Sequence, residues 1–167
     1  MRKALKILHS LASCGLIGAL LAYGLILLRA SQDSAAQFAD MRRLISAVCD
    51  YLLVPSLGVA LVTGLVAMIV HRPFQEMRWV WLKALLGLAL FESTLAITQA
   101  KAGYAAIYAQ KIVDGTPDLA DARAGLADAL SSEWTALLAI TALCVAQVVV
   151  GVWRPGLKRT PRRARAA

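Results

Sequence analysis

The chain has 167 residues, of which 59% are apolar and 17% charged, and its mean hydropathy is +0.64. This composition excludes a soluble globular domain, because it supplies too little polar surface to cover one. The formal charge of +8 does not indicate nucleic-acid binding, because the basic residues lie beside apolar runs, where lipid headgroups and the translocon recognise them. We expect the protein to contact a lipid bilayer and to bind no nucleic acid.

Four apolar runs are each about as long as the roughly 20 residues that cross a bilayer as a helix. None alternates with period two, so their backbone groups must bond within helices rather than in a barrel. We predict an all-α fold, an integral membrane four-helix transmembrane bundle with helical extensions outside the membrane, forming a single domain over residues 1–157. The runs are Leu5 to Leu28, Tyr51 to Val70, Trp79 to Thr98 and Trp134 to Trp153.

Basic residues, Arg2, Lys3 and Lys6, lie at the start of the first run near Met1, an arrangement that is also typical of a secretory signal peptide. Its apolar part exceeds the roughly 7 to 15 residues of a signal. The first small-residue pattern, Ser34-Ala35-Ala36, also falls well after Leu28. We therefore predict an uncleaved helix over about residues 5–28.

The second helix is expected to begin outside the membrane near Ala36 and to cover about residues 37–70, because apolar residues recur there at steps of three and four. Pro55 is expected to kink this helix, since proline removes a backbone hydrogen bond and its ring crowds the preceding turn. The amphipathic lead-in consists of Phe38, Met41, Ile45, Val48 and Leu52.

The third helix is predicted over about residues 79–112, ending at the turn signal Asp114-Gly115. The fourth is predicted over about residues 117–153, with Thr116 as the N-cap and Pro117 at the first helical position. Both helices therefore extend beyond the apolar runs on the same side as the start of the second helix.

Lysine and arginine collect before the first run, between the second and third runs, and after the fourth. The other two connections hold most of the acidic residues. By the positive-inside rule, we expect a multi-pass protein of the bacterial inner membrane with both termini in the cytoplasm. The basic segment 158–167 is predicted to be a disordered cytoplasmic tail against the inner headgroups.

Small and amide side chains within the runs predict close helix packing. Small residues spaced four apart let helix backbones approach one another, within the bundle or in a homo-oligomer. Gln147 is expected to hydrogen-bond a neighbouring helix, and the cysteines at 14, 49 and 144 lack paired spacing and are interpreted as small core residues. The small-residue positions are Cys14, Gly18 and Ala22 in the first helix, and Ala60 and Gly64 in the second.

His9 and Lys83 each lie four residues into a run from its cytoplasmic end, which places both about 6 Å deep at 1.5 Å per residue. With Arg72 and Trp79 nearby, they could form a cluster suited to an anionic, flat or metal-containing ligand. Each residue also has an interpretation that needs no ligand. Lys83 could extend its ammonium to the lipid headgroups, and Trp79 could belong to an interfacial aromatic belt. Arg72 could simply follow the positive-inside rule, and His9 could hydrogen-bond a neighbouring helix.

Glu92 is the deepest formal charge, 13 residues into the third run, and Gln99 lies seven residues further on the same helical face. These intramembrane polar residues indicate either a proton or ion pathway or an interhelical hydrogen bond. Asp50 and Glu133, at the outer ends of the second and fourth runs, are interpreted as solvated or helix-terminal charges.

Two stretches, Leu5-Lys6-Ile7-Leu8-His9-Ser10-Leu11 and Trp79-Val80-Trp81-Leu82-Lys83, resemble the first and third helices of a superfamily of small bacterial membrane proteins. That superfamily includes the copper-resistance CopD family and HemJ-type protoporphyrinogen oxidase, and the whole chain looks most similar to an uncharacterised branch of it. The resemblance implies a four-helix scaffold in which the first-helix histidine binds heme b. It also implies that a Trp/Lys pair on the third helix is functionally important. The matching positions are His9, Trp79 and Lys83.

Three hypotheses follow. The favoured interpretation is a non-catalytic inner-membrane component that acts through helix and periplasmic contacts with a membrane protein partner or a second copy. The first alternative is a heme-b-binding redox protein with His9 as the iron ligand and Lys83 and Arg72 near the propionates. The second is a small transporter or proton pathway using Glu92 and Gln99. No sequence motif for a nucleophile, a phosphate-binding loop or a zinc site indicates catalytic residues.

Overall fold

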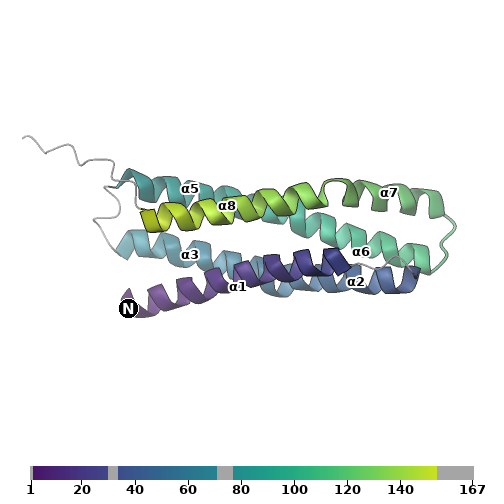
Figure 1. Cartoon of the computed structure of the whole chain (residues 1–167), viewed down its shortest axis with the longest axis horizontal. Helices are drawn as coiled ribbons and strands as arrows, with labels where there is room; N and C mark the ends of the chain where they lie inside the picture. Colours follow the sequence, from purple (N-terminus) through teal and green to yellow (C-terminus); the bar gives the residue numbers. More distant parts are fainter. Residues whose placement is uncertain (1, 30–33, 71–76, 154–167) are drawn as a thin grey trace, which may run out of the picture.

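The computed structural model describes residues 2–29, 34–70 and 77–153. Within these ranges every regular element is a helix, and the helices form four long rods that run side by side along one axis (Figure 1). Four rods are long and apolar enough to cross a membrane, which confirms the predicted all-α four-helix bundle and describes a multi-pass membrane protein. They are Lys3–Arg29, Ala35–Val70, Trp79–Val113 and Leu119–Trp153.

Three of the four rods change helix type or break part-way along. The first rod is α1 (Arg2–Arg29) alone, and the elements of the others are as follows. The second joins α2 (Ala35–Val48), the π-helical turn η1 (Cys49–Leu53) and α3 (Val54–Val70); the third joins α5 (Arg78–Ser93), the π-helical turn η2 (Thr94–Gln99) and α6 (Ala100–Val113); the fourth joins α7 (Leu119–Ser131) and α8 (Glu133–Trp153). The predicted ranges 5–28, 37–70 and 79–112 lie within the first three rods, and the predicted tail 158–167 lies outside the described residues.

The fourth rod begins two residues later than predicted, and the assignment of Thr116 as its N-cap is wrong. Gly115, with φ +67°, and Thr116 instead donate backbone hydrogen bonds to the carbonyl oxygens of Ile112 and Lys111, each at 3.4 Å. This pair of bonds is a Schellman motif, which satisfies the last carbonyls of α6. The Thr116 hydroxyl also donates to the Lys111 carbonyl at 3.3 Å, so Asp118 takes the N-cap position of α7.

Pro55 is accommodated by the π-helical turn η1 that precedes it. The Val54 N–H bonds to the Cys49 carbonyl oxygen, five residues back, in place of the four-residue step of an α-helix. The wider turn makes room for a proline ring, which in a regular α-helix crowds the carbonyl four residues earlier. The rod therefore continues through the proline position from η1 into α3.

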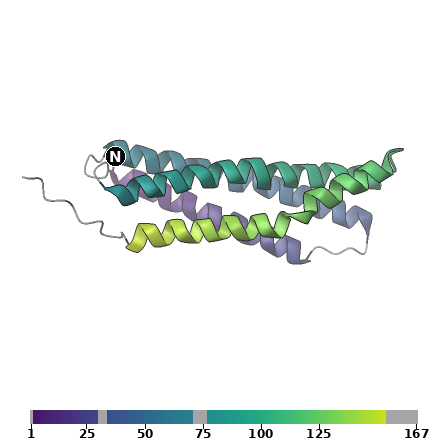
Figure 2. The same ribbon diagram turned by 90° about the horizontal axis from the view of Figure 1, so that it is seen from above.

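The rods have unequal lengths, so the molecule has two parts. The start of α1, the end of α3, the start of α5 and the end of α8 lie at one end (Figure 1). Only α2, α6 and α7 reach the opposite end, and we call these three helices the helical extension. Within it α6 packs against both α2 and α7, and the fourth rod changes direction where α7 passes into α8 (Figure 2).

The outer surface of the four-helix part is apolar, as contact with lipid requires. Leu85 and Leu138 point outward and are each 65% exposed, together with many other large aliphatic side chains. Such a continuous apolar surface is rare on proteins that face water. Exposed aromatic side chains lie near both ends of the four-helix part. Trp81 and Trp153 lie near the end where the chain begins, and Tyr51 and Trp134 lie near the helical extension. This arrangement is typical of interfacial aromatic belts.

The small residues of the first helix do not pack as a single face. Cys14 and Gly18 are exposed, and no atom lies within 4 Å of where a Gly18 Cβ would be. Gly15 makes the close contact instead, because a Cβ there would lie 2.6 Å from the Ser56 hydroxyl oxygen on α3. In the second helix Ala60 is buried and Gly64 faces α1, so that pair does pack within the bundle.

Candidate ligand-binding cavity

A cavity of about 460 Å³ opens between α1, α3, α5 and α8, toward the end of the bundle where the chain begins. Its walls are mainly aliphatic, so a bound molecule would contact hydrocarbon over most of its surface. Four helices each contribute polar groups to this wall. The polar lining residues are Lys6, His9 and Ser13 from α1, Thr63 from α3, Trp79 and Lys83 from α5, and Gln147 from α8.

His9 is half-buried and is held against α3. Its Nδ1 lies 2.9 Å from the Ala60 carbonyl oxygen and 3.0 Å from the Thr63 hydroxyl oxygen. A Cβ placed on Gly64 would lie 3.6 Å from the Cε1 of the imidazole, so the glycine lets the ring lie close to the α3 backbone. The predicted hydrogen bond from His9 to a neighbouring helix is confirmed, and the same ring also lines the cavity.

Lys83 brings a positive charge to the cavity, and none of the described lining residues is acidic. Among the described residues, no carboxylate forms an ion pair with its ammonium group, and the salt bridges there involve other residues. A Cβ on Gly151 of α8 would lie 2.7 Å from Nζ, so the amine lies against the α8 backbone. Gln147 donates from Nε2 to the Lys83 carbonyl oxygen at 3.0 Å, which confirms its predicted role between helices.

The structure brings three of the four residues predicted for a cofactor site together. His9, Trp79 and Lys83 line one cavity, and His9 and Lys83 are close enough for their charges to interact. Arg72, the fourth, lies outside the described residues. Thr63 was not singled out by its sequence position, although a hydroxyl on α3 level with His9 is a group with which an imidazole can pair.

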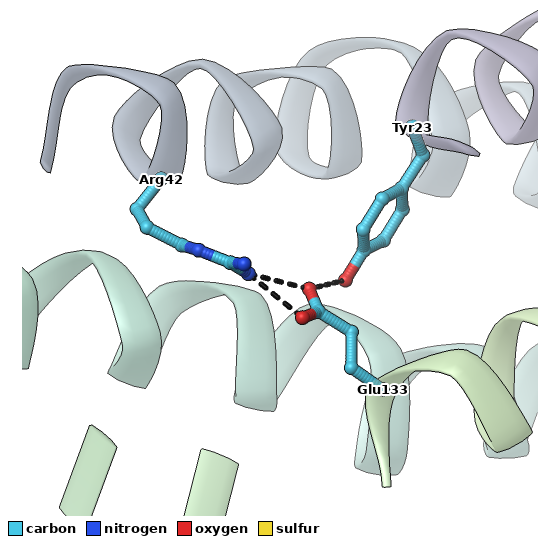
Figure 3. A network of polar contacts seen from close by, with 3 residues as sticks. All are labelled: Tyr23, Arg42 and Glu133. Atoms are coloured by element: carbon cyan, nitrogen blue, oxygen red, sulfur yellow. Dashed lines mark hydrogen bonds and ion pairs between the residues drawn. The ribbon is translucent and has the colours of Figure 1, made fainter. Parts of the chain in front are cut away.

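A second polar cluster lies where the four-helix part meets the helical extension (Figure 3). Arg42 of α2 and Tyr23 of α1 converge on the carboxylate of Glu133 at the start of α8. Arg42 Nη1 donates to both carboxylate oxygens, at 2.7 and 2.8 Å, and the Tyr23 hydroxyl donates to Oε1 at 2.7 Å. The three side chains are 4%, 1% and 7% exposed for Arg42, Tyr23 and Glu133, so the cluster is shielded from solvent.

Of the two interpretations of Glu133, the helix-terminal one is confirmed and the solvated one is wrong. Glu133 does begin α8, but its carboxylate is buried because Arg42 supplies an opposite charge there. The guanidinium carbon also lies 5.0 Å from the centroid of the Phe38 ring, within cation–π range. The sequence held one signal of this pairing: Arg42 falls at the same helical spacing as Phe38 and Ile45, on the apolar face of α2.

Glu92 and Gln99 do not form a common site. Glu92 is exposed on the outside of the bundle and does not line the cavity. Gln99 turns toward the second rod and donates from Nε2 to Asp50 Oδ1 at 2.8 Å. The π-helical turn η2 begins two residues after Glu92 and ends at Gln99, and its wider step changes the angular relation that a regular α-helix would give the two residues.

The donor groups of the cavity fit some ligands better than others. In residues 2–29, 34–70 and 77–153, no group of three or more His, Cys, Asp or Glu side chains could hold a bare metal ion. An imidazole and an ammonium in an apolar wall can bind an amphipathic anion, or a metal already held by a macrocycle. Comparisons of the chain with protein-family models, with characterised proteins and with solved structures gave no match.

Proposed function

We propose that the chain is a heme-b-binding protein of the bacterial membrane, with heme in the cavity between α1, α3, α5 and α8. The observation that carries this proposal is the juxtaposition in one apolar cavity of His9 and Lys83, whose ammonium forms no ion pair with any carboxylate of the described residues. Uncompensated charges are expensive inside membrane bundles, so this arrangement favours an anionic ligand.

The chain's own groups fit heme b in three respects. The His9 ring is fixed through Nδ1, the outer-shell arrangement typical of a ligating histidine, which leaves Nε2 to bind iron. Lys83 can pair with a propionate carboxylate, and aliphatic side chains can cover the porphyrin faces. When bound, the heme iron supplies one-electron chemistry whose potential depends on its axial ligand and on burial.

Hemin titration into the detergent-purified protein, followed by absorbance, tests the charge pairing. Lys83→Met is expected to weaken hemin binding about 10-fold or more, because a hydrogen bond to a charged group contributes roughly 1.5–3 kcal/mol. Lys83→Arg keeps the charge and is expected to retain most of the affinity. Glu92→Gln, outside the cavity, is the matched control. Equal affinity in wild type and Lys83→Met would remove Lys83 from the proposed site.

We also propose that the membrane is the inner membrane and that both termini are cytoplasmic, which places the cavity in the cytoplasmic half and the helical extension in the periplasm. The basic segments near the chain-start end support this orientation. Topology reporters fused after residue 167 and inserted at Gly115 are expected to give cytoplasmic and periplasmic signals respectively. A periplasmic signal from residue 167 would reverse the orientation.

A second function, as a non-catalytic component that acts through contacts, is favoured by one feature of the helical extension. An apolar groove of about 370 Å³ runs between its three helices, on the part that lacks a fourth rod. A photo-crosslinking residue at Leu126 is expected to capture a partner membrane protein or a second copy in cells, whereas one at lipid-facing Leu138 is not. Equal capture at both positions would count against this function. The groove is lined by Ser34, Ala35, Phe38, Ala109, Ile112, Leu126 and Leu130.

A further inference from the structure

We infer that Thr63 is a positioning residue that, together with the Ala60 carbonyl, holds His9 as the Nδ1–H tautomer and presents the Nε2 lone pair to the cavity. The tautomer follows from the hydrogen bonds alone. Its consequence for the ligand rests on the proposed heme-binding function.

The Ala60 carbonyl oxygen determines which His9 nitrogen carries the proton. It lies 2.9 Å from Nδ1, and because a carbonyl only accepts, Nδ1 must donate this hydrogen bond. The Thr63 hydroxyl oxygen lies 3.0 Å from the same nitrogen and therefore accepts from it. Its own proton can bond the Val59 carbonyl oxygen at 2.6 Å or the Ala60 carbonyl oxygen at 3.1 Å.

With the proton on Nδ1, this nitrogen has two acceptors, the Ala60 carbonyl oxygen and the Thr63 hydroxyl oxygen. A neutral imidazole carries one proton, and in the opposite tautomer the Nδ1 lone pair would face the lone pairs of the Ala60 carbonyl oxygen. The doubly protonated ring would put a second cation near Lys83 in an apolar wall, which costs electrostatic energy. The neutral Nδ1–H form is the one that these contacts stabilise.

Nε2 is then an electron-pair donor that is available to a ligand. Within the described part of the chain it has no hydrogen-bond partner, and it is not among the buried polar atoms that lack one, so it is accessible. The group that meets it must be an electron-pair acceptor or a hydrogen-bond donor. Heme iron meets that condition, whereas a carbonyl or carboxylate oxygen at this position would be repelled. The cavity is therefore expected to discriminate heme b from ligands that place an acceptor there.

The tautomer is measurable by ¹⁵N NMR of histidine in the ligand-free, detergent-solubilised protein. A His71→Gln background leaves His9 as the sole histidine, because the chain has two. The expected spectrum has a protonated Nδ1 and an unprotonated Nε2. A protonated Nε2, alone or together with a protonated Nδ1, overturns the inference whether or not heme binds.

The role of Thr63 is tested with an isosteric pair of variants. Thr63→Val removes the acceptor while keeping the shape, and is expected to raise the Nε2–H fraction and to weaken hemin binding about 10-fold, as outer-shell changes do. Thr63→Ser keeps the hydroxyl and is expected to restore both values. Metal-free protoporphyrin IX should bind the wild type and Thr63→Val equally, because it has no iron for Nε2. An unchanged tautomer and unchanged hemin affinity in Thr63→Val would remove Thr63 from this role.

Discussion

Replacement of Glu133 by leucine is expected to lower the free energy of unfolding by about 3–5 kcal/mol, the cost of leaving one partner of a buried ion pair uncompensated. The variant leaves the Arg42 guanidinium without its carboxylate partner, although Arg42 is only 4% exposed. It also removes the acceptor of the Tyr23 hydroxyl. Among the described residues, Glu133 is the carboxylate that lies within ion-pair distance of Arg42. The measurement is reversible unfolding in a fixed detergent, followed by helical circular dichroism.

A double variant and an exposed ion pair provide the controls. Glu133→Leu combined with Arg42→Leu is expected to recover much of the stability, because it removes both buried charges together. Asp40→Asn breaks the Arg43–Asp40 pair, whose side chains are 59% and 71% exposed, and is expected to change stability by less than about 1 kcal/mol. If Glu133→Leu proved no more destabilising than Asp40→Asn, the buried network would not contribute to stability as its geometry indicates.

The network matters because of where it lies. Tyr23, Arg42 and Glu133 belong to three different rods and meet where the helical extension leaves the four-helix part. At or near this junction the second and third rods contain the π-helical turns η1 and η2, and the fourth rod breaks at Ser132. The ion pair and the Tyr23 hydrogen bond together therefore fix the first, second and fourth rods relative to one another near these irregular backbone segments.

Replacement of His9 by alanine is expected to abolish the spectral signature of coordinated heme. Among the described residues, His9 is the histidine that lines the cavity, and its imidazole is the group assigned to the iron. The hydrogen bonds of Nδ1 to α3 are lost with the ring, and the cavity gains room that free imidazole can enter. Imidazole added to His9→Ala is therefore expected to restore part of the signature, as measured by the Soret absorbance after hemin addition.

Ser13→Ala is the matched control for His9→Ala. Ser13 also lines the cavity from α1, but its hydroxyl donates to the His9 backbone carbonyl at 2.8 Å and does not touch the ring. This variant is expected to keep the wild-type spectrum. A Soret band of unchanged position and strength in His9→Ala would show that another group binds the iron, and would contradict the assignment of His9.

Much of the fold was predictable because it depends on length and periodicity. The spans follow from apolar runs that hydrocarbon forces into helices, and the common depth of His9 and Lys83 follows from the rise per residue. The start of the second helix near Ala36 was also predictable, from the apolar spacing that leads to Leu52. Each of these features can be inferred from the sequence of a single helix, without knowing which helices are its neighbours.

The features that were missed depend on which helices are neighbours. Glu133 is separated from Arg42 by 91 residues and from Tyr23 by 110, so no local pattern pairs them. Thr63 meets His9 across 54 residues, for the same reason. The π-helical turn η2 contains no proline to signal it, and it changes the face that Gln99 presents.

The absorption spectrum of the wild-type protein, purified in detergent after expression with ample heme, tests the central claim most directly. The account predicts a Soret band that stays with the protein through size-exclusion chromatography, at a stoichiometry near one heme per chain. A colourless protein that also fails to bind added hemin would contradict the claim that the cavity between α1, α3, α5 and α8 is a heme site.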